Sequence, residues 1–554
     1  MPTSKTLSVY RDAWMEQSFN DEISCLLARV LEENPHQTPQ EALVSVEKSL
    51  LKNNPYTPPE GNQCPINNLP NELLASIFQS GVNLQYEELE ERNGDDDEPE
   101  WEDVDNDEDD NGDDHEEDGA DEGQYDTEST GSSEGTEESD DNDDEEIHDF
   151  QVLVSHVCRR WRSLTLVTSN LWTILSFSKN PKVEKAMEYI IRSKDLPLTV
   201  YFDSSFAAGL SQEHHDSQVS QFFDLIEPEI SRWRTFTYRR HPKRDLESLM
   251  SRLEELPEAR LLESFRILYS SGYEAQHFST ASNRTCIPFH GHAPKLKEAV
   301  LWGVNVDWDS SFFHGLRRLE MASYLLRFFR PSYVTFVQMI KSSPKLHTLA
   351  LSFAGPNLLD SMDADFLTIP SLRNLLLQTD HPQYVAALVQ RLNLPNLHTL
   401  GLNLVAGDYS SFIRALSTPG HGQTQSLLQT ISCLTIFGLS CETASSVELL
   451  LAQLVALKTL QIESLYPQEN ATIVEKLTMP AATRSESPNS SDEVFCPKLE
   501  ELAVSEWNGE KLRAIINARR NAGVPLKKMV IRKSALSMQD IRWIRKNVEH
   551  LVLY

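Results

Sequence analysis

A short apolar phrase recurs through the C-terminal part of this 554-residue chain and limits what that part can fold into. The phrase has the form apolar-x-x-apolar-x-apolar, as in Leu346-His-Thr-Leu349-Ala-Leu351, and the next two copies follow at steps of 26 and 25 residues. A unit of this length holds one strand and one helix, which cannot bury their apolar faces without neighbours. Seven clear copies begin at Leu346, Leu372, Leu397, Leu457, Leu499, Leu526 and Val548, and five weaker copies begin at Trp233, Leu262, Leu296, Leu316 and Ile431.

Amphipathic helices are predicted between the phrases. The stretches SYVTFVQMIKSS from Ser332, QYVAALVQRL from Gln383 and SMQDIRWIRKNV from Ser537 carry apolar residues at helical spacing. Ser537 and Asp540 have the spacing of a capping box. We therefore predict an α/β fold over residues 179–554, in the form of an irregular leucine-rich-repeat solenoid (horseshoe) with strands inside and helices outside. An ordinary α/β domain with apolar strands is the alternative.

The repeat is irregular in two respects. The asparagine expected at the ninth position of each unit is absent, and the long step from Leu457 to Leu499 contains the insertion ATRSESPNSSDE at 482–493. The x positions of the phrase are expected to face the inner curve, although no charge or aromatic theme among them names a ligand. The candidate contacts for a protein target are Thr348, Ala350, Asn374, Leu376, Thr399, Gly401, Thr459 and Gln461.

The negative charge of the chain is confined to one segment. Residues 87–149 contain 35 Asp and Glu and one Arg. Removing them from the chain's 84 acidic and 50 basic residues leaves 49 of each, so the remainder is neutral. A segment so poor in apolar side chains cannot offset its ordering entropy, and we predict that it is disordered. The neutral remainder makes nucleic acid an unexpected partner, because phosphate binding requires an excess of Lys and Arg.

Apolar helices are predicted on both sides of this acidic segment. Residues 66–78 read INNLPNELLASIF, and residues 154–164 read VSHVCRRWRSL. The sequence NLW follows at 170–172, where Thr168 and Ser169 are expected to cap a further helix that includes Leu175. The ordered succession of LP, IF, VC-R-W and LW closely resembles an F-box, especially that of F-box proteins from mushroom-forming fungi. This resemblance places the F-box at 63–178, interrupted by the acidic segment, and leaves 1–62 as an N-terminal helical extension and linker.

An F-box is a three-helix module that docks on the Skp adaptor of a cullin-RING ubiquitin ligase. The resemblance implies that Leu69 and Pro70 lead the first helix onto the adaptor and that Leu171 and Trp172 close the module. The residues themselves agree in kind, because three short helices cannot hide this much apolar surface alone. The alternative is that the same side chains only pack against the repeats. The remaining adaptor-binding candidates are Leu73, Ile77, Val157, Cys158, Trp161 and Leu164.

No motif in the sequence indicates catalysis or metal binding. There is no G-x-S-x-G, P-loop or G-x-G-x-x-G pattern, and the seven cysteines are scattered without a C-x-x-C pair. A partial match to a calcium loop at 107–118 lacks the bidentate Glu that such loops require. We therefore expect no enzyme activity, no cofactor and no bound metal.

The cysteine pattern and the N-terminal sequence bear on the compartment. Scattered, unpaired cysteines are typical of a reducing environment. The start, MPTSKTLSVYRDAWMEQ, lacks the apolar core of a secretory signal, and no apolar run approaches the roughly 18 residues of a membrane span. These features predict a cytoplasmic or nuclear protein without a membrane partner.

The predicted function is that of a non-catalytic substrate receptor in a Skp-cullin-F-box ubiquitin ligase. The F-box would bind the Skp adaptor, and the repeats would bind an unknown target protein. The alternative is an acidic histone chaperone or chromatin scaffold that acts through residues 87–149, because polyacidic segments screen basic proteins.

Overall fold

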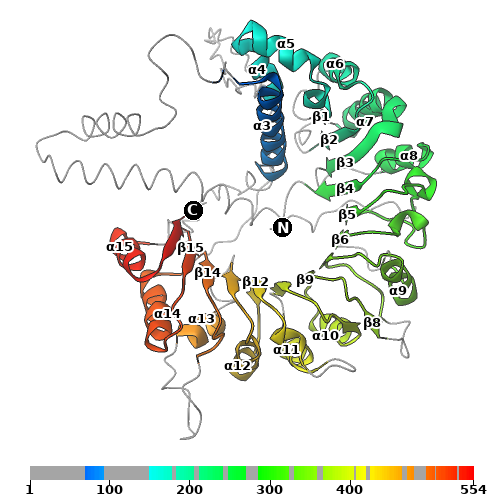
Figure 1. Cartoon of the computed structure of the whole chain (residues 1–554). Helices are drawn as coiled ribbons and strands as arrows, with labels where there is room; N and C mark the ends of the chain where they lie inside the picture. The colour runs from blue at the N-terminus through cyan, green and yellow to red at the C-terminus, as the bar shows by residue number, and fades with distance from the viewer. Residues whose placement is uncertain are drawn as a thin grey trace, which may run out of the picture.

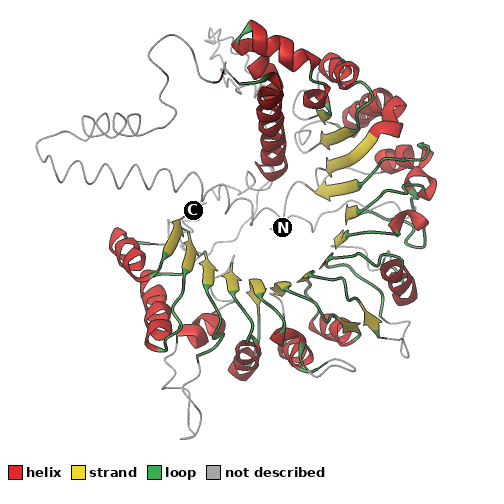
Figure 2. Ribbon diagram, in the orientation of Figure 1, coloured by secondary structure: helices red, strands yellow, loops and turns green. Residues whose placement is uncertain are grey.

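The computed structural model shows an open arc of strands and helices (Figures 1 and 2). Strands line the inner side of the arc, and helices cover its outer side. The structure describes residues 66, 69–92, 149–177, 183–204, 211–240, 247–269, 285–322, 330–358, 366–404, 407–419, 425–463, 471–478, 494–505, 507–532 and 536–553. The predicted N-terminal extension (1–62), most of the acidic segment (93–148) and the insertion at 482–493 lie outside the described residues.

Fourteen parallel strands form one continuous sheet in which spatial order follows chain order. Two further short strands, β8 and β10, pair with each other in a separate small sheet. The predicted α/β class is therefore confirmed. The strands are β1 Ile174–Phe177, β2 Leu198–Asp203, β3 Trp233–Arg240, β4 Ser264–Tyr269, β5 Glu298–Trp302, β6 Arg318–Ala322, β7 Thr348–Ser352, β8 Leu367–Thr368, β9 Asn374–Gln378, β10 Leu392–Asn393, β11 Thr399–Leu404, β12 Cys433–Leu439, β13 Thr459–Ile462, β14 Glu501–Val504, β15 Lys528–Ile531 and β16 His550–Leu553.

Helices connect most neighbouring strands and run along the outer side of the arc (Figure 1). Among the described residues, no helix is both long and apolar enough to cross a membrane. The helices are α3 Asn71–Arg92, α4 Phe150–Val157, α5 Arg159–Val167, α6 Val183–Ser193, α7 Gln212–Ile226, α8 Glu247–Glu255, α9 Tyr333–Lys341, α10 Pro382–Gln390, α11 Ser410–Ser417, α12 Ala444–Gln453, α13 Ala471–Thr478, α14 Gly509–Asn521 and α15 Met538–Asn547, with single 3-10 turns such as η2 Ser169–Trp172 between them.

Every copy of the apolar phrase coincides with a strand. In eleven of the twelve copies the strand begins at the third position of the phrase, as β7 begins at Thr348 after Leu346. The three apolar positions of this copy, Leu346, Leu349 and Leu351, all lie in the main core between sheet and helices. Side chains alternate across a strand, so positions three and five of each phrase face the inner side of the arc.

The sheet begins two strands earlier than the sequence indicated. β1 starts at Ile174, before the predicted boundary at 179, and Leu175 belongs to this strand instead of the predicted helix. Only the single turn η2 forms, because Thr173 and Ile174 are β-branched and β1 pairs along its whole length with β2. β2 escaped notice because Pro197 occupies the first apolar position of its phrase.

The first helix is longer than predicted. α3 runs to Arg92, so residues 87–92 of the segment predicted to be disordered are helical. Four of these six residues are Glu, which has a high helix propensity despite its charge. Asp149, at the other end of the same segment, is also ordered: its carboxylate accepts a hydrogen bond from Tyr189 and pairs with Lys185.

The three helices predicted between phrases are confirmed as α9, α10 and α15. Ser332 caps α9 by accepting a hydrogen bond from the Thr335 amide at 3.0 Å. Ser537 caps α15 in the same way, accepting from the Asp540 amide at 3.2 Å. The predicted capping box at Ser537 therefore marks the start of α15 correctly, whereas Thr168, the other predicted cap, makes no side-chain capping bond to η2.

One buried arginine anchors the chain where it enters β14. Arg519 on α14 is 1% exposed and pairs with no carboxylate among the described residues. Its guanidinium donates hydrogen bonds to the carbonyls of Phe495, Cys496 and Leu499 at 3.0–3.1 Å. Burial lowers the pKa of this guanidinium because it disfavours the charged form. The three carbonyl oxygens stabilise the positive charge in place of a carboxylate.

We expect Arg519→Met to lower the free energy of unfolding by about 2–4 kcal/mol, because it removes three hydrogen bonds to backbone carbonyls, of which the Cys496 carbonyl keeps another donor, the Leu499 amide. Chemical denaturation followed by circular dichroism measures this change. The matched control is Arg542→Met on the exposed face of α15, which should stay within about 0.5 kcal/mol of wild type. Equal effects of the two substitutions would contradict the anchoring role.

Candidate functional site

Two surfaces are candidates for function: the helical module α3–α5 with η2, and the inner face of the sheet. Figure 1 shows α3 running along the inside of the arc, while α4 and α5 lie at its end beside β1. The ring of Tyr86 on α3 meets the ring of Tyr201 on β2 edge to face, with centroids 6.1 Å apart. The C-terminal half of α3 therefore lies over the inner face of the first strands.

Contacts across the acidic segment hold α3 to α4 and α5. The Arg160 guanidinium donates to the Leu69 carbonyl at 2.6 Å and to the Asn71 side chain at 2.9 Å. At the other end of α3, Gln85 accepts a hydrogen bond from the Phe150 amide at 2.7 Å and so satisfies the start of α4. Because these bonds lie at both ends of α3, the module is closed despite the long intervening segment.

The core of the module is formed by one stripe of α3. Leu74, Phe78 and Val82 are buried there, and the Phe78 ring packs on Trp161 with centroids 4.9 Å apart. Gly81 allows α4 to approach closely, because a Cβ atom at this position would lie 2.2 Å from the Phe150 ring.

The neighbouring stripe of α3 is exposed. Leu73, Ile77 and Leu84 are 53%, 44% and 50% exposed, although their helical spacing matches that of the buried stripe. Among the residues that the structure describes, only one of the two apolar stripes of this helix is covered. The exposed stripe is therefore available to a partner.

The ten predicted adaptor-binding residues divide into three groups. Leu171 and Trp172 are 0% and 1% exposed, so they belong to the core and cannot touch a partner. Leu69, Trp161 and Leu164 are half-buried against that core. The exposed members are Pro70, Leu73, Ile77, Val157 and Cys158, with Cys158 in the break between α4 and α5.

Additional exposed apolar side chains were missed by the sequence analysis. Leu153 lies one helical turn before Val157 on α4, and both are exposed. Leu166 and Val167 at the end of α5 are exposed as well. The i, i+4 spacing of Leu153 and Val157 was the signal that could have identified the first of them.

Trp172 occupies the first position of a copy of the apolar phrase. Its indole N–H donates to the Thr165 carbonyl seven residues earlier at 2.9 Å, and that of Trp233 donates to the Ile226 carbonyl seven residues earlier at 3.0 Å. Trp172-x-x-Leu175-x-Phe177 also fits the apolar phrase that precedes and enters β1. The LW pair is thus part of the first repeat, which joins the helical module to the sheet.

The predicted inner-face residues form two rows across adjacent strands. Thr348, Asn374 and Thr399 align in one row, and Ala350, Leu376 and Gly401 align in the next. Thr459 and Gln461 continue the two rows on β13. Cys433 and Thr435 on β12 lie in these rows between the residues of β11 and β13. The sequence analysis missed them because the copy of the phrase that begins at Ile431 is one of the weaker copies.

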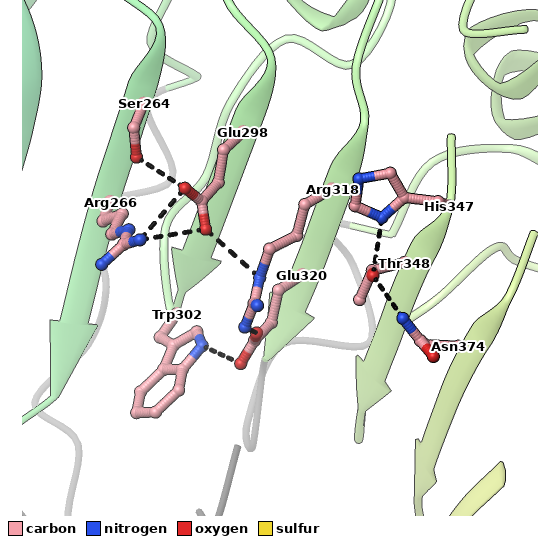
Figure 3. Close-up of polar contacts among 9 residues, drawn as sticks. All are labelled: Ser264, Arg266, Glu298, Trp302, Arg318, Glu320, His347, Thr348 and Asn374. Carbon is pink, nitrogen blue, oxygen red and sulfur yellow. Dashed lines mark hydrogen bonds and ion pairs between the residues drawn. The ribbon is translucent and has the colours of Figure 1, made fainter. Parts of the chain in front are cut away.

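A charged network occupies the same rows on β4–β6 (Figure 3). Glu298 accepts hydrogen bonds from Ser264 at 2.9 Å and Arg266 at 3.0 Å and pairs with Arg318 at 3.3 Å. Burial would raise the pKa of Glu298, but Arg266 and Arg318 outweigh it and hold the pKa below its usual value. The network is therefore charged and internally compensated at neutral pH.

The network continues to a buried carboxylate. Glu320 is 1% exposed and accepts hydrogen bonds from Arg318 at 2.9 Å and from the indole of Trp302 at 3.1 Å. On β7 and β9 the inner-face rows carry no charged side chain. There the Thr348 hydroxyl accepts a hydrogen bond from the Asn374 amide group at 3.1 Å and lies 3.0 Å from Nδ1 of His347 (Figure 3). The inner face thus changes along the arc from paired charges to hydroxyl and amide groups.

Among the described residues, no group of three or more His, Cys, Asp or Glu side chains is placed to hold a metal ion. No protein-family model matches the chain, and no curated protein matches its sequence. What the two surfaces do is therefore inferred from their own residues.

We expect Gly81→Val to lower the free energy of unfolding by about 1–3 kcal/mol, because the new side chain must displace the Phe150 ring. The same substitution should accelerate hydrogen exchange at the backbone amides of α4. Ser80→Val, at an exposed position of the same helix, is the control and should change stability by less than about 0.5 kcal/mol. Unchanged exchange in α4 for Gly81→Val would mean that the close approach of the helices is not what holds the module together.

Proposed function

We propose that this protein is a non-catalytic substrate receptor of a Skp-cullin-F-box ubiquitin ligase. In this proposal α3–α5 form an F-box that binds the Skp adaptor, and the curved sheet is an irregular leucine-rich-repeat solenoid that binds a target protein. The observation that carries it is the exposed apolar stripe of Leu73 and Ile77 on a helix whose neighbouring stripe is packed in the core.

The energetics of that stripe favour a partner. Each exposed Leu or Ile side chain contributes about 1.5–3 kcal/mol when it is fully removed from water. Leu153, Val157 and Val167 add exposed apolar area on the adjoining helices. Several exposed apolar side chains on one module are typical of an interface. Single exposed apolar residues are common on any protein surface and indicate nothing about partners.

The acidic segment does not prevent the module from closing. Residues 93–148 form a long excursion, but each doubling of loop length costs only about 0.6 kcal/mol of closure entropy. The hydrogen bonds of Arg160 and Gln85 join the parts on either side of it. The helical module can therefore close across a connection of this length.

The ligase reaction needs no catalytic group from this chain under this proposal. A receptor that binds an adaptor with one surface and a target with another raises the local concentration of the target's lysines near the charged ubiquitin carrier. The inner-face rows, which lie on a different part of the arc from the exposed stripe of α3, provide the second surface.

We expect Leu73→Ser/Ile77→Ser to weaken binding to a purified Skp adaptor at least tenfold, because it removes two apolar contacts from the stripe. Co-purification and titration of the full chain with the adaptor measure the change. The matched control is Met187→Ser/Ile191→Ser, an exposed apolar i, i+4 pair on α6, which should retain binding within about twofold.

Absence of adaptor binding by the folded wild-type chain would refute the receptor proposal. The rival proposal, an acidic chaperone for basic proteins, would then be tested by deleting residues 93–148, a deletion that leaves all of α3 intact. Loss of histone binding in that variant, with no effect of Leu73→Ser/Ile77→Ser, would favour the rival.

A further inference from the structure

The edge of the sheet where the strands begin carries a run of basic side chains. Seven connecting segments lead into β5, β6, β7, β9, β11, β12 and β13, and together they contain eight Lys and Arg and no Asp or Glu. The segments are 292–297, 314–317, 341–347, 370–373, 391–398, 425–432 and 454–458. We call the exposed cationic and imidazole side chains Arg317, Lys345, His347, Arg373, His398 and Lys458 the basic rim.

The members of the basic rim are neighbours in space. The His347 amide donates to the Arg317 carbonyl, the Arg373 amide to the His347 carbonyl and the His398 amide to the Arg373 carbonyl, each at 2.9 Å. Neighbouring strands of a sheet lie about 4.8 Å apart, so the rim presents one side chain at each such step. Ser432 stands between His398 and Lys458 and continues the line.

These cations are not used for internal ion pairs. Among the described residues, Arg317, Lys345 and Arg373 pair with no carboxylate, and the Arg373 guanidinium donates to the Asn396 carbonyl at 2.9 Å. Lys458 interacts electrostatically with Glu500, but the ion pair of Glu500 is with Lys527 at 2.9 Å. Cations at helix C-termini would be explained by the helix dipole, but the rim residues, unlike Lys341 at the end of α9, lie beyond the helices.

The opposite edge of the sheet is mainly acidic from β5 to β13, with Arg330 in the loop after β6 as a basic exception. In the described loops that follow β5, β9, β11, β12 and β13, the charged residues are acidic. They are Asp307, Asp309, Asp380, Asp408, Glu442 and Glu463. The two inner-face rows between the edges are uncharged from β7 to β13, so a ligand on this part of the arc meets positive charge along the rim and mainly negative charge along the opposite edge.

We propose that the basic rim is the docking surface for an acidic stretch of a partner protein, bound as an extended chain. Alternate side chains of an extended polypeptide point in opposite directions, so acidic side chains can lie on the rim while small side chains lie on the adjoining inner-face rows. Those rows offer hydroxyl and amide groups at the half-buried Thr348, Asn374 and Thr399 and an apolar contact at the half-buried Leu376, whereas Ala350 and Gly401 are buried. The identification of this partner as the target of a ligase rests on the proposed function, whereas the docking site itself does not depend on that function.

Nucleic acid fits this surface less well, although it is also a polyanion. Single strands are bound by aromatic side chains that stack on bases, and the two inner-face rows from β6 to β13 contain none. The acidic opposite edge would also repel a ligand that carries phosphates on all sides. The chain's own residues 93–148, with 30 acidic and no basic side chains, are the competing occupant that a test must separate.

The test uses the full-length chain and fluorescence anisotropy at about 50 mM salt. The probe is a labelled peptide of alternating Glu and Ala, about 16 residues long, and the comparison probe is a single-stranded oligo-dT of equal charge. The rim variant is Arg317→Glu/Lys345→Glu/Arg373→Glu. The control variant, Lys511→Glu/Arg542→Glu/Lys546→Glu, makes the same change in net charge on exposed positions of α14 and α15.

We expect the peptide to bind wild type and the control variant equally, and the rim variant at least tenfold more weakly. Binding should also weaken steeply with added salt. Equal binding to all three proteins, or none to any of them, would overturn the proposal. So would tighter, rim-dependent binding of oligo-dT, which would make the rim a nucleic-acid site.

A deletion of residues 93–148 completes the test. Peptide binding that is absent in wild type and present only in this deletion variant would show that the chain's own acidic segment occupies the rim, which contradicts docking of a partner. These outcomes are independent of the adaptor experiment, because none of the substitutions touches α3–α5.

Discussion

The backbone ladder between parallel strands is the constraint on which the rest of this structure depends. Each strand between β1 and β16 in the large sheet is hydrogen-bonded to the strand before it and the strand after it, in an order that follows the chain. A single register therefore repeats from unit to unit, and residues at the same position of the apolar phrase fall into rows. The core takes positions one, four and six of the repeating phrase, the inner-face rows take positions three and five, and the basic rim takes position two, with Lys345 just before the phrase.

The helical module resolves an apparent conflict between packing and docking. Phe78 and Trp172 belong to the same continuous core as the strands, so the module closes the first end of the sheet. Leu73 and Ile77, on the adjoining stripe of the same helix, remain exposed. The sequence posed these roles as alternatives, but different faces of α3 allow the module to pack against the repeats and still present an apolar surface to a partner.

What the sequence predicted depended on how local the signal was. The phrase around Leu346 is contained in six residues, so the strand, its core side chains and inner-face positions such as Thr348 and Ala350 followed directly from it. β1 was missed because Trp172 and Phe177 replace the usual aliphatic residues. The network of Glu298, Arg266 and Arg318 was not predictable, because it joins three strands whose register is set only by folding.

The two proposed surfaces differ in where they lie, and this difference has a mechanical consequence. The exposed stripe of α3 is attached at β1–β2, whereas the basic rim extends from β6 to β13. A continuous hydrogen-bonded sheet with one core connects them, and such a sheet resists bending more than a flexible linker does. An acidic target on the rim would therefore be held at a defined position relative to an adaptor on α3. For a receptor without catalytic groups of its own, that fixed separation determines which lysines of the target come within reach.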